Sequence, residues 1–357
     1  MILSENHLMI REMARQFAEK ELTREVLDEA EATNSFRKSV LDHMVQAGLT
    51  SIKIPEEYGG QGGDNLSFVI ALEEVCRKSA VAGIYMSNPN SLGSGPLLIN
   101  GTEEQKRYYI PKLATLEKRM CFALSEPGAG SDAGSIITRA VRDGDSYVIS
   151  GSKCFISGAT IADYAVVFAK TDPEQGVRGI SAFIVDLKLP GVILGKPERK
   201  MGLIGYPIGD IVLEDVRVPA ENMLGEENRG FYYLMQHLEK ERLMGSWGTL
   251  GMAEYAFELC VQRANERLVA GKPLGAYQHW QFEIAKAAAE LDQARSYVEH
   301  LTLLFMAGES VNTQVSIAKY ATSELAYKIS DLGVQIWGGP GILRENAIAR
   351  QFVDTRH

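Results

Sequence analysis

The sequence has little of what marks membrane, metal-binding or disulfide-stabilised proteins. Its 357 residues include only four cysteines, and their spacing suits neither a metal site nor a disulfide framework. No apolar run reaches the roughly 18–20 residues that a membrane-spanning helix needs. The sequence also lacks internal repeats and low-complexity tracts. We therefore expect no bound metal and no membrane segment.

An excess of positive charge is also missing. The net charge of −9 at pH 7 argues against general affinity for nucleic acid or anionic membranes. It does not exclude a phosphate-bearing cofactor, because a local pocket can hold one. No charged and then apolar leader precedes the first helical pattern, so we expect a cytoplasmic protein. A processed organellar protein would have the same features.

What the chain contains is typical of a soluble globular protein in three sections. Hydrophobic residues make up 45% and charged residues 23% of the sequence. In residues 1–117 apolar side chains recur with a period of about 3.6 residues, which predicts helices. Residues 118–224 show short β-branched runs separated by turn signals. Residues 225–357 return to four long helical patterns.

This order predicts an α+β fold. We expect an N-terminal helical domain (1–117), a middle antiparallel β-barrel or sandwich (118–224) and a C-terminal four-helix bundle (225–357).

Two segments of the middle section carry the most specific pattern. They are Phe122-Ala-Leu-Ser-Glu-Pro-Gly-Ala-Gly-Ser-Asp132 and Gly151-Ser-Lys-Cys-Phe-Ile-Ser157. Each places a hydroxyl, Ser125 or Ser157, beside aromatic and aliphatic side chains, and a glycine-rich turn allows close approach of a ligand. A flat, partly polar ring needs such apolar walls with single hydrogen bonds at its edge. An ordinary β-hairpin with a glycine-rich turn would show the same residues.

A carboxylate in the third section is the candidate base. Glu241 lies in a long helical pattern, and Gly245 and Gly248 follow it at i+4 and i+7, on the same face. Each glycine costs roughly 1 kcal/mol relative to alanine inside a helix. A thin ligand could approach this smooth face, and a close helix crossing would explain the glycines equally well.

These segments resemble the flavin-contacting signatures of the acyl-CoA dehydrogenase family. Further similarities follow in the family's order over nearly the whole chain, and they are Pro55-Glu-Glu-Tyr-Gly-Gly60, Glu241-Arg242, Arg267 to Gln278, and Gln335-Ile-Trp-Gly-Gly-Pro-Gly341. The resemblance implies an FAD-dependent enzyme that removes an α-proton and a β-hydride from an acyl-CoA. It also implies an electron-transferring flavoprotein as the redox partner.

The resemblance assigns the flavin to both strand segments. Ser125 is expected to bond the pyrimidine edge of the ring and Ser157 the region of N5. Phe155 stands where many relatives carry tryptophan, so the apolar face is kept and an indole N–H is lost. The apolar contacts expected around the ring are Phe122, Leu124, Phe155 and Ile156.

The remaining FAD contacts are expected to come from a neighbouring subunit. Arg267 and Gln278 match family residues that reach the pyrophosphate, and an arginine binds phosphate oxygens bidentately. Gln335, Gly338 and Gly339 match the segment along the adenosine half, although a helix cap explains the two glycines as well. The resemblance thus implies a homo-oligomer, a dimer of dimers in the family pattern.

For the substrate, the resemblance implies a base and two further contacts. One subset of the family places its catalytic glutamate before an arginine in this helix, which assigns Glu241. A larger subset places it in a C-terminal segment whose glutamate would fall a few residues beyond His357. Arg242 and Ser131 are expected at the acyl-CoA site.

The acyl pocket is expected between residues 84–98 and the Glu241 helix. Polar residues in that wall suggest a short or polar acyl group, unless they bond CoA or the backbone; they are Ser87, Asn88, Asn90 and Ser91. Three functions remain open: an acyl-CoA dehydrogenase, an enoyl-CoA reductase of the crotonobetainyl type that uses the same site in reverse, and a non-catalytic flavin- and acyl-CoA-binding relative.

Overall fold

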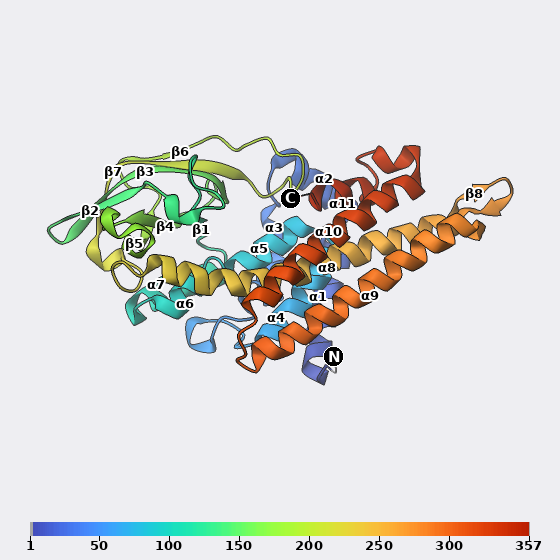
Figure 1. Ribbon diagram of the computed structural model, residues 1–357, viewed down its shortest axis with the longest axis horizontal. Helices are drawn as coiled ribbons and strands as arrows, with labels where there is room; N and C mark the ends of the chain where they lie inside the picture. The colour runs from blue at the N-terminus through green and yellow to red at the C-terminus, as the bar shows by residue number, and fades with distance from the viewer. Residues whose placement is uncertain (1–2, 357) are drawn as a thin grey trace.

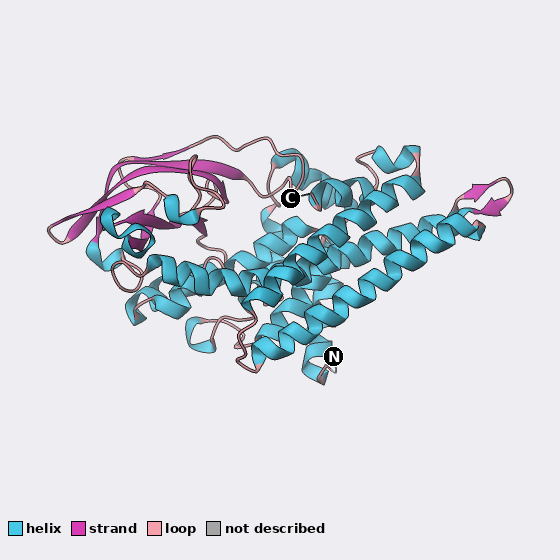
Figure 2. Ribbon diagram, in the orientation of Figure 1, coloured by secondary structure: helices cyan, strands magenta, loops and turns pink. Residues whose placement is uncertain are grey.

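The computed structural model describes residues 3–356, and its helices and strands follow the predicted order (Figures 1 and 2). The N-terminal helices are α1 (Glu5–Glu21), α2 (Arg24–Thr33), α3 (Lys38–Gln46), α4 (Asn65–Lys78), α5 (Ala80–Asn90), α6 (Gly95–Asn100) and α7 (Glu103–Ala114). Helix α4 begins after Asp64, whose carboxylate accepts a hydrogen bond from the Ser67 N–H at 2.7 Å. Nearly all of α4 is buried, so it forms the centre of the helical core.

The middle section is one twisted sheet of β1 to β7. Its strands are β1 (Met120–Ala123), β2 (Arg139–Asp143), β3 (Ser146–Ser157), β4 (Tyr164–Lys170), β5 (Ile180–Asp186), β6 (Val192–Leu194) and β7 (Ile208–Pro219). The order is β1-β4-β2-β3-β7-β6, with β5 paired to β4. Most pairs are antiparallel as predicted, but β1 runs parallel to β4, and β2 makes a short parallel pairing with β4. The sheet is the half-barrel form of the expected β domain.

The C-terminal section contains three long helices and a short fourth one, where the sequence predicted four long ones. They are α8 (Gly230–Glu266), α9 (Gln278–Met306), α10 (Asn312–Trp337) and α11 (Ala347–Asp354). A small hairpin, β8 (Leu268–Val269) and β9 (Lys272–Pro273), joins α8 to α9. Helix α8 runs from the β domain to the opposite end of the molecule, where the hairpin lies (Figure 1).

One hydrophobic core joins the two helical sections, because buried side chains of α1–α5 cluster with those of α8–α11. Two glycines of α8 belong to this packing. A Cβ on Gly248 would lie 3.3 Å from the Cys76 sulfur, and one on Gly251 would lie 2.4 Å from the Glu73 carbonyl oxygen. The close crossing of α8 and α4 therefore accounts for Gly248 and Gly251, whereas a Cβ on Gly245 would meet only the Lys319 side chain at 3.7 Å, so the crossing does not explain Gly245. No helix in residues 3–356 has both the length and the apolar character needed to cross a membrane.

Candidate active site

Glu241 lies on the face of α8 that meets the N-terminal helices. The Ser91 hydroxyl, at the C-terminal end of α5, donates a hydrogen bond to Glu241 Oε1 and lies 3.3 Å from the Met244 sulfur. The Glu241 side chain keeps 20% of its surface exposed, so the carboxylate is held on one side and accessible on another. Such a held carboxylate can move a proton to or from a ligand.

The surroundings of Glu241 favour its neutral form. Burial raises the pKa of Glu241, while the Ser91 hydrogen bond and the charge of Lys53 act in the opposite direction. Burial also lowers the pKa of Lys53 to about 8, although Glu241 favours its charged form. The Lys53 Nζ lies 3.6 Å from the Met244 sulfur and 5.2 Å from the Phe68 ring centroid. A raised carboxyl pKa is what a general base near neutral pH requires.

His237 connects the base to the β domain. It lies one helical turn before Glu241, and its Nε2 is 3.4 Å from Glu241 Oε1. Its ring is stacked on Phe122 of β1, with centroids 5.9 Å apart and an interplanar angle of 23°. Burial, and then Lys53 and Lys240, lower the pKa of His237 to about 4. A neutral imidazole thus lies between the candidate base and the strand expected to contact flavin.

A buried ion pair joins the two strand signatures. Lys153 of the second signature donates to Glu126 Oε1 of the first at 2.7 Å and to the Leu124 carbonyl at 3.1 Å. Glu126 also accepts from the N–H groups of Ile137 at 2.6 Å and Thr138 at 3.1 Å. The Lys153 and Glu126 side chains are 0% and 2% exposed. The pair fixes the end of β1 beside β3, and with it the distance between the two serine-bearing segments.

A β-bulge turns Phe155 outward. Lys153 pairs with Ile211 and Ile156 with Gly209, so two residues of β3 face one residue of β7. Phe155 has a φ of 55°, which is uncommon for a bulky residue, and its side chain is 69% exposed. An exposed aromatic ring on a strained bulge is the kind of feature that clusters at ligand sites.

The two predicted serines fit the edge of a flat ring beside Phe155. Ser157 is exposed at the end of β3, and Ser125 is half-buried just after β1. The Ser125 carbonyl accepts from the Cys154 N–H at 2.9 Å, which brings the two segments together. The glycines of the intervening turn, Gly128 and Gly130, have open space where a Cβ would stand. These residues fit the expected flavin.

The other residues expected at the flavin are Phe122, Leu124 and Ile156. Phe122 and Leu124 are half-buried against a core cluster of the β domain. The Ile156 side chain is 2% exposed within a second core cluster, so only its backbone can meet a ligand.

The five remaining residues expected to bind FAD lie away from this site. Arg267 and Gln278 flank the β8–β9 hairpin, at the end of the molecule opposite the β domain (Figure 1). Gln335, Gly338 and Gly339 are at the end of α10 and in the turn after it. All five are exposed. One chain therefore does not bring them to Ser125 and Ser157, and they can complete such a site only in a neighbouring subunit.

Gly338 also has a structural role. Its φ is 67°, and its N–H bonds the Val334 carbonyl at 3.1 Å, so it caps α10. Gly339 does not have a positive φ. The helix-cap alternative thus applies to Gly338 and not to Gly339.

Most of the polar wall predicted for the acyl pocket bonds the backbone. The Asn88 amide donates to the Met120 carbonyl at 3.1 Å. Asn90 is buried and bonds three backbone groups, those of Leu49, Lys53 and Met86. Ser91 is different, because it bonds the candidate base. The asparagines therefore do not indicate a polar substrate. The alternative, that they bond the backbone, is the one the structure supports.

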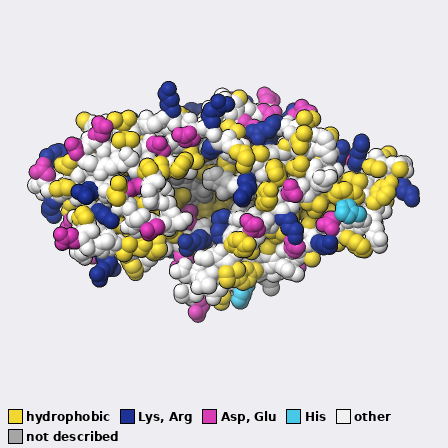
Figure 3. Space-filling model, turned by 45° about the horizontal axis from the view of Figure 1, so that its top comes forward, with side chains coloured by type: hydrophobic (Ala, Val, Ile, Leu, Met, Phe, Trp, Pro, Cys, Tyr) yellow, Lys and Arg dark blue, Asp and Glu magenta, His cyan; other side chains and the backbone are white. Residues whose placement is uncertain are grey.

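The two expected acyl-CoA contacts have different surroundings. Ser131 is exposed near the end of the first signature, and Arg242 is half-buried on α8. The surface is hollowed between the β-rich end and the helical end, with Lys and Arg side chains at the edges of the hollow (Figure 3). A cleft of this kind is open to a large anionic ligand such as CoA.

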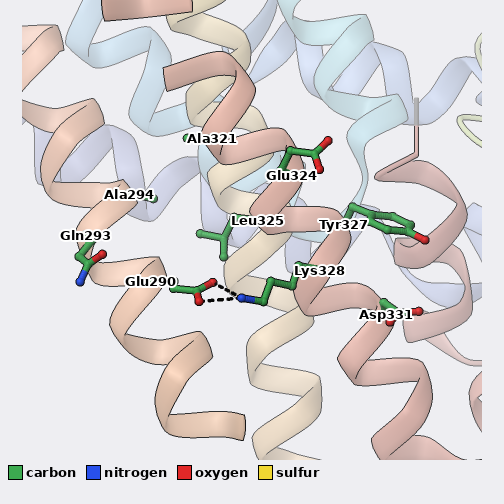
Figure 4. A pocket seen from close by; sticks show the side chains of 9 residues that line it. All are labelled: Glu290, Gln293, Ala294, Ala321, Glu324, Leu325, Tyr327, Lys328 and Asp331. Atoms are coloured by element: carbon green, nitrogen blue, oxygen red, sulfur yellow. Dashed lines mark hydrogen bonds and ion pairs between the residues drawn. The ribbon is translucent and has the colours of Figure 1, made fainter. Parts of the chain in front are cut away.

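Another groove lies between α9 and α10 (Figure 4). Its volume is about 630 Å³, and an ion pair between Lys328 and Glu290 at 2.6 Å crosses it. Polar and charged side chains of the two helices line it together with Ala294, Ala321 and Leu325, and it contains neither signature strand nor Glu241. Within residues 3–356, no group of three or more His, Cys, Asp or Glu is placed to hold a metal ion.

Three parts of this site did not emerge from the sequence pattern. His237 is at i−4 from Glu241, so helical spacing alone could have placed it on the same face. Lys53 and the Glu126–Lys153 pair depend on contacts between residues distant in sequence, for which the sequence carries no local signal.

Comparison with known proteins agrees with the geometry. The acyl-CoA dehydrogenase N-terminal, middle and C-terminal domain models match residues 4–117, 121–216 and 228–357. The chain is 47% identical to the caffeyl-CoA reductase-Etf complex subunit CarC of Acetobacterium woodii, over 100% of this chain and 94% of the relative. It is 43% identical to the 3-(aryl)acrylate reductase of Clostridium sporogenes, with the same coverage.

A solved structure shows the same fold. Butyryl-CoA dehydrogenase from Megasphaera elsdenii superposes with a TM-score of 0.94 at 35% identity, covering 100% of this chain and 94% of that chain. Members of the family are FAD-dependent oxidoreductases that act on CH–CH bonds. The chain belongs to the acyl-CoA dehydrogenase family.

Proposed function

We propose that this enzyme interconverts an acyl-CoA and its α,β-unsaturated counterpart, with Glu241 moving the α-proton. The observation that carries the proposal is the half-buried carboxylate of Glu241, bonded by Ser91 and separated from β1 by the His237 ring. Bound FAD supplies the acceptor or donor of the β-hydride, because no amino acid side chain can exchange a hydride.

The residues around Glu241 have separate roles in proton transfer and in binding. Ser91 fixes one carboxylate oxygen, which limits the rotamers of Glu241 and stabilises the ionised form. Burial acts against ionisation and so brings the proton affinity closer to that of an activated α-carbon. Ser125, Ser157 and Phe155 would hold the flavin ring, and Arg242 and Ser131 would contact acyl-CoA.

Two directions of the same reaction are supported by different observations. Relatives of 47% and 43% identity are named as reductases of unsaturated acyl groups, which favours enoyl-CoA reduction as the physiological direction. The fold shared with butyryl-CoA dehydrogenase supports desaturation of a short acyl-CoA as the second candidate. We further propose an electron-transferring flavoprotein as the partner, since the first relative is a subunit of such a complex. A cytoplasmic location accords with this partner.

Anaerobic titration tests the function directly. The purified protein is expected to contain about one FAD per chain, given one pair of strand signatures in each chain. A saturated short acyl-CoA should bleach the oxidised flavin, and an enoyl-CoA should reoxidise flavin that dithionite has reduced. Protein that binds FAD but responds to neither compound in a panel of chain lengths would be a non-catalytic relative, and the proposal would fail.

Arg267→Ala is expected to weaken FAD binding by at least about tenfold, because a charged hydrogen bond contributes roughly 1.5–3 kcal/mol. We propose that Arg267 and Gln278 reach the FAD of a neighbouring chain in a homo-oligomer, so acyl-CoA binding should change less. FAD retention on dilution and the mass in solution are measured together, with exposed Lys286→Ala as the control on α9. Monomeric wild-type protein with full FAD affinity would contradict this arrangement.

Ser91→Ala should shift the pH dependence of flavin bleaching upward. The Ser91 hydrogen bond lowers the pKa of Glu241, so its removal lets burial raise that pKa further. A base must be ionised to accept a proton, and the pH needed for half-maximal bleaching rate therefore rises. Stopped-flow bleaching rates are measured between pH 5.5 and 9, about the range in which a raised carboxyl pKa would be seen. They give the shift of the half-maximal pH. An unchanged profile would show that Ser91 does not act on the base. Ser87→Ala, on the same helix, is the control.

A further inference from the structure

Two buried polar side chains near the candidate base, His237 and Ser94, make no side-chain hydrogen bond within residues 3–356. His237 is 3% exposed, its Nδ1 makes no hydrogen bond, and its Nε2 lies 3.4 Å from Glu241 Oε1 without hydrogen-bond geometry. Ser94 is 0% exposed, and its hydroxyl makes no hydrogen bond either. Buried polar groups are bonded in the great majority of cases. These atoms therefore indicate a partner that the protein does not itself provide.

The two residues belong to adjoining walls. Gly95 follows Ser94 directly, and a Cβ on Gly95 would lie 2.7 Å from Cε1 and 3.2 Å from Nδ1 of His237. The absence of a side chain at Gly95 thus makes room for the imidazole. On its other sides the ring meets Phe122 and the carboxylate of Glu241.

The position and neutral state of His237 restrict the ligand groups that it can bind. If Glu241 acts on the α-carbon and the acyl chain lies between residues 84–98 and α8, as the resemblance implies, the carbons beyond the α-carbon would pass near the imidazole and the start of α6. A neutral imidazole can donate one hydrogen bond and accept another, and a hydroxyl does the same. Both therefore suit an uncharged polar group, such as a hydroxyl or a ketone. The charged groups that face the ring are Lys53, Lys240 and Glu241.

We propose that His237 and Ser94 form a polar subsite that binds a hydroxyl or ketone oxygen on the acyl chain beyond the β-carbon. The two residues then determine specificity, and the enzyme prefers acyl groups that carry such an oxygen over purely aliphatic ones of equal length. The inference rests on the proposed function, because it takes Glu241 as the base that positions the acyl chain.

Binding to reduced enzyme tests this subsite without turnover. Protein loaded with FAD and reduced by dithionite cannot oxidise an acyl-CoA, so calorimetry under argon gives its affinity alone. Two pairs of ligands differ only by hydroxyl in place of methyl, and they are 4-hydroxybutyryl-CoA with pentanoyl-CoA, and 5-hydroxypentanoyl-CoA with hexanoyl-CoA. In at least one pair the hydroxylated ligand should bind at least about fivefold more tightly, the effect of one good hydrogen bond.

Variants assign the preference to the two residues. His237→Phe keeps a ring against Phe122 and removes both nitrogens, so the preference for hydroxyl should disappear. Ser94→Ala should reduce it, and serves as the second test if His237→Phe does not fold. Exposed His300→Phe is the control and should keep the preference.

Three results would overturn the subsite. They are equal affinity within each pair, a stronger affinity for the methyl members, and a preference that survives in both His237→Phe and Ser94→Ala. Failure of the proposed function would be recognised by a different result. Oxidised flavin would then stay unbleached by every acyl-CoA, whatever the binding preference.

Discussion

Glu241→Gln is expected to reduce the rate of flavin bleaching by acyl-CoA at least about a hundredfold, with FAD still bound. Glutamine keeps the size of the side chain and can still accept the hydrogen bond from Ser91, but it cannot take up the α-proton at neutral pH. General-base contributions are typically ~10²–10⁴-fold. Stopped-flow reduction under anaerobic conditions measures the rate, and the absorbance of the oxidised protein measures bound FAD.

Glu239→Gln is the matched control, two residues away on a different face of α8. The Glu239 carboxylate accepts from the Val311 N–H at 3.3 Å, and a glutamine oxygen can replace it there. The control should therefore lose far less activity. Bleaching by Glu241→Gln at nearly the wild-type rate would place the base outside this helix, in the C-terminal segment that the larger subset of the family uses.

The sequence predicted the features that depend on local residue patterns. The change from helical periodicity to short β-branched runs and back predicted the order of the three sections. The segments ending at Asp132 and Ser157 were predicted to lie together, and the pairing of the Ser125 carbonyl with the Cys154 N–H shows that they do. Glu241 was predicted to face other protein or ligand, and it lies against Ser91, just after the end of α5.

What could not be predicted depends on contacts between distant parts of the chain. The sequence pattern allowed either a ligand or a second helix to pack against Gly248, and only the position of α4 shows that a helix does. Asn90 looked like a polar pocket wall until its three backbone partners were known. The parallel pairing of β1 with β4 likewise follows from the long connection between them, which no residue pattern specifies.

Lys153→Met is expected to destabilise the protein by about 3–5 kcal/mol, the effect of leaving one partner of a buried ion pair uncompensated. Both side chains are almost fully buried, and Glu126 would keep its charge or take up a proton without Lys153. The ends of β1 and β3 would then separate more easily, so FAD content should fall as well. Urea unfolding at one protein concentration and the FAD absorbance measure the two effects.

The Glu126–Lys153 pair also makes the stability of the protein depend on pH. Burial raises the pKa of Glu126, but the Ile137 N–H, Lys153 and Thr138 outweigh it, so the net pKa lies below the ordinary value. A lowered folded-state pKa stabilises the protein above the unfolded-state pKa of about 4.3, and this contribution is lost as the pH falls through the folded-state value. Glu126→Gln should therefore lose less stability on acidification than the wild type does.

Two comparisons isolate the buried charge. The double variant Glu126→Gln, Lys153→Met should be more stable than Lys153→Met alone, because it leaves no unpaired charge in the interior. Lys328→Met breaks an exposed pair with Glu290, at 62% and 41% side-chain exposure, and should change stability by about 1 kcal/mol or less. If Lys153→Met were no more destabilising than Lys328→Met, the ion pair would not be what holds the two serine-bearing segments together. The flavin site would then depend on the backbone hydrogen bond from the Cys154 N–H to the Ser125 carbonyl.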